Sequence, residues 1–433
     1  MITAGALAAG VPAFAARTDA PPKARSHIPE LRHRLDLSVL PRAGRQSLEP
    51  IPHGKELFGV FCNSASDCWA VGEIKNKDNT VNQVLHWTGK KWFSVKVPNQ
   101  AGTAKGDFSE LFAVRCTSAK NCWAVGDSQR SGNVAQLDQA LHFDGTKWTV
   151  AATPAPGGTA GGAFNTLDDV ACTSAKDCWA VGEYGLVGNG SQMEVGFNQV
   201  LHFDGRHWMF MKSPDPAGTS MGDVNALDGV RCTGPTACWA GGSDGTVAPT
   251  PNFRNEILFS NGKKWTVVKG VPNPAGTGKL HLNFINTLAC TAKDDCWAVG
   301  LTGNLNGNNN KQFEHNEALH WNGKHWATVK TPNPGGKQDE LFGVTCAAAQ
   351  DCWAVGTEGF QPGLNEALHW NGAKWSVVHT VNGGGTGKDV SNALNSVRCA
   401  SRSNCWAVGD SESAGAIFAN QILHWNGSKW SDS

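Results

Sequence analysis

Residues 341–378 read LFGVTCAAAQDCWAVGTEGFQPGLNEALHWNGAKWSVV, and this stretch contains the unit that decides the fold. Four short pieces of it, at residues 341–346, 352–356, 365–370 and 375–378, are rich in β-branched and aromatic residues. Gly, Asn or Pro residues bound the pieces, which is typical of short antiparallel strands. The Asn-Gly pair between the third and fourth pieces predicts a hairpin with a type I′ turn, in which both central residues have positive φ.

The unit recurs seven times from residue 55 onward, and its clearest marker is Cys-x5-Cys-Trp-Ala. The first cysteines of successive markers are 54, 56, 60, 58, 56 and 53 residues apart. Because about four to eight four-stranded sheets can close into a ring, the repeat predicts a β-propeller. We expect an all-β, seven-bladed β-propeller of four-stranded antiparallel blades over residues 51–433. The predicted repeats lie at about residues 55–100, 101–156, 157–216, 217–274, 275–334, 335–380 and 381–433.

All fourteen cysteines fall in these markers, two in each repeat. An even number of cysteines in fixed local pairs is typical of disulfides in an oxidising compartment. A zinc site would instead need its full set of ligands at one point, whereas each pair stands alone in its repeat. We therefore predict one hairpin disulfide per blade, no metal and no other cofactor. The predicted disulfides are Cys62–Cys68, Cys116–Cys122, Cys172–Cys178, Cys232–Cys238, Cys290–Cys296, Cys346–Cys352 and Cys399–Cys405.

The N-terminal segment predicts export. Residues 1–15 form an apolar run ending in Ala-Phe-Ala, a small-x-small cleavage pattern, and predict a signal peptide. Residues 16–50 are basic, rich in Pro and Ala, and predict a poorly ordered leader. Its end, residues 46–50, is a candidate to complete the last sheet, because the chain stops soon after Trp430. The net charge is zero and no apolar run of about 20 residues follows, so we expect a secreted, extracellular protein with no nucleic-acid partner and no membrane span.

The third piece of six repeats ends in a histidine followed by Trp or Phe, whereas the fourth repeat has Phe259-Ser260 and lacks both residues together. An aromatic ring beside a directional polar group suits a sugar, whose apolar face stacks on the ring while its hydroxyls form hydrogen bonds. A structural alternative, a hydrogen-bonded histidine beside a packing aromatic, stays open. The candidate ligand-binding residues are His86, Trp87, His142, Phe143, His202, Phe203, His320, Trp321, His369, Trp370, His424 and Trp425.

Other repeated positions are interpreted as structural. Seven tryptophans follow the second cysteines and seven open the fourth pieces, and we expect these to pack one blade against the next. A polar pair such as Asn365-Glu366 opens the third piece of every repeat. Its uniformity predicts a role such as tying down the preceding loop.

The stretch from His369 to Trp375 resembles the repeats of seven-bladed bacterial lectin propellers, in which sugars lie at blade junctions against Trp and polar side chains. Trp-Ala-Val-Gly followed by a turn and a Trp is similar to photosystem assembly-factor-like and other Asp-box propeller repeats. The Asp-box likeness is partial, because no spacer separates Asp144 from Gly145. The cysteine pairs and the Ala/Gly-rich start resemble secreted actinobacterial proteins. The resemblance implies the fold over residues 55–433 and a lectin-like function.

No nucleophile motif, Gly-rich phosphate loop or metal box occurs in the sequence, so we expect the chain not to be an enzyme. The first functional hypothesis is a secreted, multivalent glycan-binding propeller whose partner is a cell-surface or polymeric glycan. The alternative is a protein-interaction scaffold with a secreted protein partner, such as a subunit of a lectin-bearing toxin particle. A carbohydrate-active enzyme is the least favoured hypothesis.

Overall fold

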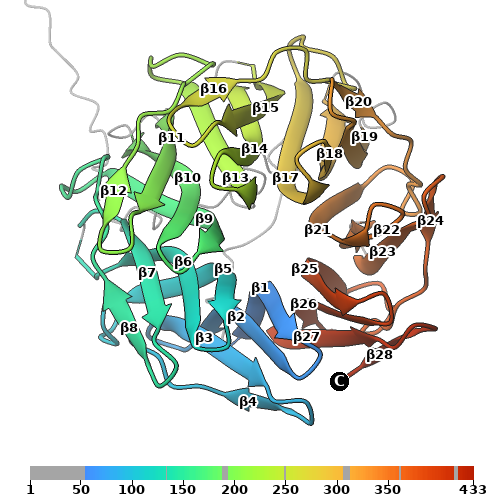
Figure 1. The fold of residues 1–433 in the computed structure, drawn as a ribbon, viewed down its shortest axis with the longest axis horizontal. Helices are drawn as coiled ribbons and strands as arrows, with labels where there is room; N and C mark the ends of the chain where they lie inside the picture. Colours follow the sequence, from blue (N-terminus) through green and yellow to red (C-terminus); the bar gives the residue numbers. More distant parts are fainter. Residues whose placement is uncertain are drawn as a thin grey trace, which may run out of the picture. The chain divides into compact units, whose positions relative to one another are not determined.

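The computed structural model describes residues 54–433 apart from 133, 188–193, 248–249, 306–312, 360–361 and 414–417. In this part of the chain, 28 strands form seven four-stranded antiparallel sheets, each from one repeat. The sheets stand as blades around a common axis (Figure 1). The predicted all-β, seven-bladed propeller is therefore confirmed. The predicted signal peptide, the leader and the candidate strand at 46–50 lie outside the described residues.

The strands of each blade follow one another in chain order and are called A, B, C and D. Blades 1 to 4 comprise β1 (Gly54–Ser64), β2 (Asp67–Lys75), β3 (Thr80–Trp87), β4 (Trp92–Ser94); β5 (Phe108–Ser118), β6 (Asn121–Gln129), β7 (Leu137–Phe143), β8 (Trp148–Ala151); β9 (Ala163–Ser174), β10 (Asp177–Val187), β11 (Glu194–Phe203), β12 (Trp208–Phe210); and β13 (Asp223–Gly234), β14 (Ala237–Thr246), β15 (Asn252–Ser260), β16 (Trp265–Val267). Blades 5 to 7 comprise β17 (His281–Ala292), β18 (Asp295–Asn304), β19 (Phe313–Trp321), β20 (Trp326–Thr328); β21 (Asp339–Ala348), β22 (Asp351–Glu358), β23 (Leu364–Trp370), β24 (Trp375–Val377); and β25 (Ser391–Ser401), β26 (Asn404–Glu412), β27 (Phe418–Trp425), β28 (Trp430–Asp432).

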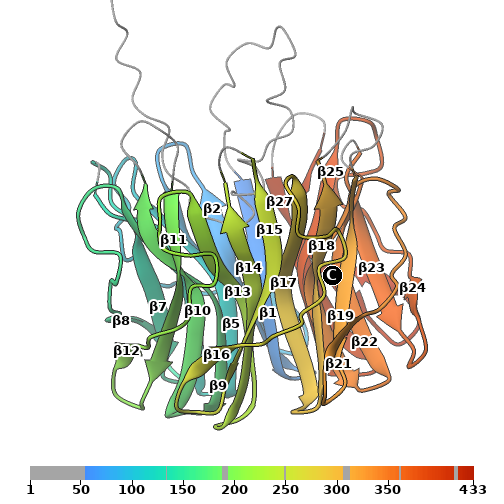
Figure 2. The same cartoon turned by 90° about the horizontal axis from the view of Figure 1, so that it is seen from above.

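The A strands surround the axis and the short D strands form the rim (Figure 1). Each A strand contacts the A strands of both neighbouring blades, including β1 with β25. The strands run roughly along the axis (Figure 2). Because each blade is an antiparallel meander, its A–B hairpin and C–D turn lie at one end, and its B–C and D–A connections at the other. We call the first end the hairpin face.

The A–B hairpin of every blade is closed by a disulfide between two residues paired across the strands. Cys346 lies opposite Cys352 in the register of β21 and β22, with their Cα atoms 3.9 Å apart. All seven predicted bonds are present, and no free cysteine occurs among the described residues. Cysteines held as disulfides cannot be zinc ligands, so the zinc alternative for these pairs is excluded.

The glycine of Cys-Trp-Ala-Val-Gly is required by a close approach between strands A and B. A Cβ on Gly356 would lie 1.8 Å from the carbonyl oxygen of Glu340. Strand A has a β-bulge at this level, between Leu341 and Gly343, and a bulge shifts the backbone locally. The glycine of the motif therefore allows a close backbone contact between strands A and B that any side chain would prevent.

The predicted C–D hairpin is present, but its turn is not of type I′. In blade 6, Gly372 has a φ of 91°, whereas Asn371 does not have positive φ. Trp370 pairs with Trp375 across a four-residue loop. The Asn371 side chain stabilises this loop, since its Oδ1 accepts hydrogen bonds from the backbone N–H groups of Ala373 and Lys374. The Asn thus acts through its side chain, as in an Asx turn.

The core consists of clusters between neighbouring blades rather than a single central cluster. One cluster joins Trp69 and Val71 of blade 1 to Leu111, Leu141 and Trp148 of blade 2. Trp69 and Trp148 meet edge to face with ring centroids 5.4 Å apart. This contact confirms the predicted wedge role of the two tryptophan sets, and it recurs at every junction.

The ring closes by packing of blade 7 on blade 1. The sheet of blade 7 takes its four strands from residues 391–432. Asn395 Nδ2 donates to the backbone oxygen of Leu57 at 3.0 Å. The Trp406 ring lies 4.7 Å from Trp87 and 5.2 Å from Trp92. This junction therefore uses the same two aromatic contacts as five of the other six, whereas the junction of blades 3 and 4 has only the Trp179–Trp265 contact.

Candidate functional site

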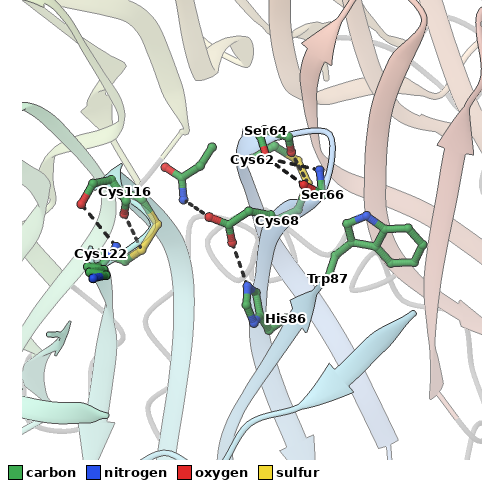
Figure 3. Close-up of polar contacts among 12 residues, drawn as sticks. Cys62, Ser64, Ser66, Cys68, His86, Trp87, Cys116 and Cys122 are labelled. Atoms are coloured by element: carbon green, nitrogen blue, oxygen red, sulfur yellow. Dashed lines mark hydrogen bonds and ion pairs between the residues drawn. A yellow bond between two sulfur atoms is a disulfide. The ribbon is translucent and has the colours of Figure 1, made fainter. Parts of the chain in front are cut away.

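The pleat of strand C separates the two residues of each predicted His-aromatic unit. Successive side chains of a strand point to opposite faces, and His86 and Trp87 leave β3 in opposite directions (Figure 3). His86 stacks on Trp69 of its own blade, whereas Trp87 lies against Trp406 of blade 7. The two residues of a unit therefore belong to different blade junctions.

Each histidine is held within its own blade. The register of β2 and β3 places His86 opposite Trp69, and the rings stack with centroids 4.0 Å apart. His86 Nε2 donates to Asp67 Oδ1 at 2.7 Å. His202 stacks on Trp179 in the same way, with centroids 4.2 Å apart. The other histidines lie tilted against the corresponding tryptophan, at Trp123–His142 (4.5 Å), Trp297–His320 (4.5 Å), Trp353–His369 (4.5 Å) and Trp406–His424 (4.4 Å).

In five blades the polar partner of the histidine is the residue just before the second cysteine. Four further blades repeat the bond from His Nε2, to Asn121 (2.5 Å), Asp177 (2.8 Å), Asp295 (2.6 Å) and Asp351 (2.8 Å). In blade 7, Asn404 stands at this position, and its Oδ1 and His424 Nε2 are buried without a hydrogen-bond partner.

The aromatic residue that ends strand C packs on the strand B tryptophan of the preceding blade. These contacts are Phe143–Trp69 (4.9 Å), Phe203–Trp123 (4.8 Å), Trp321–Trp239 (4.9 Å), Trp370–Trp297 (4.8 Å), Trp425–Trp353 (4.7 Å) and Trp87–Trp406 (4.7 Å). The strand B tryptophan thus contacts the histidine of its own blade, or Phe259 in blade 4, and, where one is present, the aromatic residue of the next blade.

The structure therefore regroups the predicted residues by junction. A junction is called complete when a histidine from one blade and an aromatic residue from the next contact the same tryptophan. Blade 4 leaves two junctions incomplete. His202 of blade 3 faces blade 4, which has Ser260 in place of the aromatic residue. Trp321 of blade 5 also faces blade 4, which has Phe259 in place of the histidine. The five complete junctions combine His86 with Phe143, His142 with Phe203, His320 with Trp370, His369 with Trp425 and His424 with Trp87.

Sequence reasoning missed the acidic or amide partner, although the sequence contains a signal for it. Asp or Asn precedes the second cysteine in six repeats, and Ala237 replaces it in blade 4. Blade 4 also has Phe259 in place of the histidine. A polar donor and its acceptor are lost together because either one alone would be left without its partner.

The junction residues are half-buried rather than enclosed. The histidine side chains in blades 1, 3, 5 and 6 are 23 to 32% exposed. The aromatic residues at the ends of strand C are likewise only partly buried. Burial lowers the pKa of His142 and of His424, the two histidines that face an asparagine. Those two rings are therefore held in the neutral state at neutral pH.

The second oxygen of the acidic partner is also occupied. Asp67 Oδ2 accepts a hydrogen bond from Asn63 Nδ2 at 2.9 Å. Thr173 and Thr291 donate in the same way to Asp177 and Asp295. The acceptor is thereby held in one orientation by the fold.

The described residues contain no group of three or more His, Cys, Asp or Glu side chains placed to hold a metal ion. No helix among them is long and apolar enough to cross a membrane. One open hollow of about 400 Å³ lies on the hairpin face between blades 4 and 5. Its walls come from the hairpin residues around Cys232 and Cys290, including Thr236, Ala237 and Lys293.

The polar pair that opens strand C ties neighbouring blades together. Asn316 Nδ2 donates to Glu366 Oε1 of the next blade at 2.6 Å and to the backbone oxygen of Pro332 at 2.9 Å. Burial raises the pKa of Glu366 to about 9, and it raises the pKa values of Glu256 and Glu317 well above their usual range. Glu366 is therefore neutral at pH 7. The pair is structural, as predicted, but it holds the D–A connection and the next blade rather than the preceding B–C loop.

Comparison with known proteins shows the fold. No protein-family model matches the chain, and no curated protein matches it. An ulvan lyase, described as a new family of polysaccharide lyase, is 11% identical with a TM-score of 0.55, over 90% of this chain and 98% of that chain. The ulvan lyase bound to -[GlcA(1-4)Rha3S]- is 9% identical with a TM-score of 0.51, over 86% and 92%. The six-bladed fungal lectin from Aleuria aurantia is 11% identical with a TM-score of 0.42, over 76% and 97%.

The expectation that the chain is not an enzyme is corrected by this comparison. Two of these structures are polysaccharide lyases that share the propeller fold over most of both chains. The expectation rested on the absence of catalytic sequence motifs. Enzymes nevertheless occur among proteins that share this propeller fold. Because function depends on the site grafted onto a fold, missing motifs cannot exclude catalysis here.

Proposed function

We propose that the chain is a multivalent carbohydrate-binding propeller that acts outside the cell, with one weak binding site at each complete blade junction. The observation that carries this proposal is the fivefold recurrence of a half-buried aromatic ring beside a half-buried histidine, which is hydrogen-bonded to Asp or Asn at four of the five junctions. At the junction of blades 1 and 2, for example, Phe143 and the hydrogen-bonded His86 both contact Trp69.

The chemistry of the junction suits a sugar. The exposed part of an aromatic ring stacks on the apolar C–H face of a pyranose, while an imidazole or carboxyl group accepts or donates a directional hydrogen bond. In blade 1, Asn63 fixes Asp67, and Asp67 in turn orients His86. The fold has therefore already ordered this polar group, so binding a ligand would not add the entropy cost of ordering it.

The placement of the junctions suits a polymeric ligand. Every junction histidine lies beside an A–B hairpin, and all A–B hairpins emerge on the hairpin face. Several weak sites on one face of a rigid ring can engage neighbouring sugars of a surface together. The overall avidity then exceeds the affinity of one site by roughly 10² to 10⁴ without any new contact.

The location outside the cell is supported by the disulfides. Seven of them are present, and disulfides persist in oxidising compartments. The apolar start of residues 1–15 is consistent with export.

A glycan array probed with the full chain, followed by sedimentation with insoluble polysaccharides, tests the proposal. We expect binding to a restricted set of glycans, with much tighter retention on the polymer than on the matching monosaccharide. Absence of binding to every glycan and polymer at high protein concentration would refute the proposal.

A further inference from the structure

The residue before each first cysteine forms a ring around the axis that the junction sites do not use. In chain order this ring consists of Phe61, Arg115, Ala171, Arg231, Ala289, Thr345 and Arg398. Each lies near the end of an A strand, next to the disulfide, and therefore close to the hairpin face. Three of the seven are arginines, and all three are half-buried.

Two of the three guanidinium groups meet over the same ring, and the third acts on both through its charge. Arg115 of blade 2 and Arg398 of blade 7 each place Cζ 4.7 Å from the ring centroid of Phe61, in the blade between them. Arg231 belongs to blade 4, yet its charge acts on both of the others and lowers their pKa values. Blades 4 and 7 share no junction, so this interaction runs across the axis.

The cluster holds more positive than negative charge. Asp169 forms an ion pair with Arg231 and also accepts hydrogen bonds from the backbone N–H groups of Val230 and Val170. Arg115 and Arg398 form no ion pair with any described residue. Arg398 Nε is fully buried and lacks a hydrogen-bond partner. Burial, together with Arg231, lowers the pKa of Arg398 to about 10. Guanidinium groups stay protonated in proteins at neutral pH.

An unpaired guanidinium N–H in the interior costs free energy, and so does the mutual repulsion of three like charges. A bound anion would remove both costs, because a guanidinium presents its N–H groups in a planar fork that matches an oxyanion. Two charges in the cluster have no carboxylate partner, which matches the charge of a dianion.

We propose that Arg115, Arg231 and Arg398 form an anion-binding site on the propeller axis that takes a divalent oxyanion, either inorganic sulfate or phosphate or the terminal phosphate of a larger ligand. This site is separate from the blade junctions and does not depend on carbohydrate binding there. Phe61 holds two of the guanidinium groups in place through cation–π contacts.

Calorimetric titration of the full chain at constant ionic strength tests the proposal, with sodium sulfate, sodium phosphate, glucose 6-phosphate and sodium acetate as probes. We expect saturable 1:1 binding of the dianions and far weaker binding of acetate. Tighter binding of the sugar phosphate than of inorganic phosphate identifies a larger ligand, and equal binding identifies the free ion. Lack of saturable binding of every dianion overturns the proposal.

Two variants with the same change in charge separate this site from general attraction. Arg398→Met should weaken sulfate binding about tenfold or more, because a charge-assisted contact is lost. Arg206→Met, which removes an exposed charge from a turn of blade 3, should leave sulfate binding unchanged. Equal affinity in wild type and Arg398→Met overturns the proposal.

Stability provides an independent readout. Without anion, Arg398→Met should melt at the same temperature as wild type or higher, and added sulfate should no longer raise its melting temperature. A purely structural arginine would instead give a less stable variant with an unchanged response to sulfate. If Arg398→Met does not fold, Arg115→Met and a selenate-soaked crystal provide the same decision: selenate beside Arg398 Nε supports the site, and an empty axis at saturating selenate overturns it.

Discussion

At the scale of single residues, blade 4 is a natural experiment on the junctions. Six blades pair a histidine with Asp or Asn, and blade 4 has Phe259 and Ala237 at the same two positions. Phe259 packs on Trp239 with ring centroids 4.7 Å apart. The blade therefore keeps the ring contact of the histidine and dispenses with the hydrogen bond.

Restoring the pair in blade 4 tests this account. Phe259→His alone should destabilise the protein by about 1 kcal/mol, because the imidazole gains no acceptor in a half-buried position. Adding Ala237→Asp should recover most of that loss, giving a favourable coupling energy of about 1 kcal/mol in a double-mutant cycle measured by denaturant unfolding. Strict additivity of the two changes would contradict a structural His–Asp pair.

Trp370 separates packing from binding at one junction. Trp370→Ala removes a ring that lies 4.8 Å from Trp297, and should cost about 3 kcal/mol of unfolding free energy while removing one of the binding sites. Trp370→Phe is the matched control, because Phe143 and Phe203 occupy the same position in blades 2 and 3. It should keep both stability and the number of sites. Thermal melts and binding stoichiometry measure the two effects, and an unchanged stoichiometry in the alanine variant would speak against the junction site.

At the scale of the element, each A–B hairpin is a short closed loop. Cys346 and Cys352 are six residues apart, and chain entropy predicts about 2 kcal/mol of stabilisation for a loop of this length. The double variant Cys346→Ser/Cys352→Ser should lose that amount in denaturant unfolding and keep the fold. Titration of the denatured, unreduced wild type should find no free thiol, and several thiols per chain would contradict the disulfide assignment.

The elements were predictable where their signals are local. Strands, hairpin disulfides and the number of blades follow from residues close together within one repeat, as in residues 341–378. The prediction of a type I′ turn was wrong, because only Gly372 of the Asn-Gly pair has positive φ, while the Asn371 side chain stabilises the loop.

The junctions were only partly predictable. The pleat of strand C turns the side chains of His86 and Trp87 towards different blade junctions. The residues that meet at one junction, such as His86 and Phe143, therefore come from different repeats. The polar partner of the histidine, Asp67 in blade 1, could have been identified from the sequence, because blade 4 lacks both this polar residue and the histidine. The convergence of Arg115, Arg231 and Arg398 depends on ring closure, which no single repeat encodes.

At the scale of the whole molecule, the polar pairs that open the C strands should make stability depend on pH. The pKa of Glu366 is about 9 in the folded state against a usual 4.5, and those of Glu256 and Glu317 are raised as well. Groups with a raised folded pKa contribute stability that is full below the unfolded pKa and is lost as pH rises towards the folded pKa. Melting temperatures should therefore fall between about pH 4.5 and 9.

The matched variant replaces all three glutamates by glutamine, the residue that blades 1, 2, 3 and 7 carry at this position. Glutamine keeps the acceptor for the neighbouring asparagine and cannot ionise. Glu256→Gln/Glu317→Gln/Glu366→Gln should melt as the wild type does at pH 5 and higher than the wild type at pH 9. Parallel pH profiles for the two proteins would show that these carboxyl groups do not titrate as proposed.

The central claim is that sugars bind between blades, at positions set by the pairing of one blade with the next. A crystal structure of the protein soaked with a panel of monosaccharides at high concentration tests it most directly. The account predicts sugar density at the complete junctions, such as those of Phe143 and Trp370, and none where blade 4 supplies Ser260 or Phe259. Sugar bound elsewhere with every complete junction empty would contradict it.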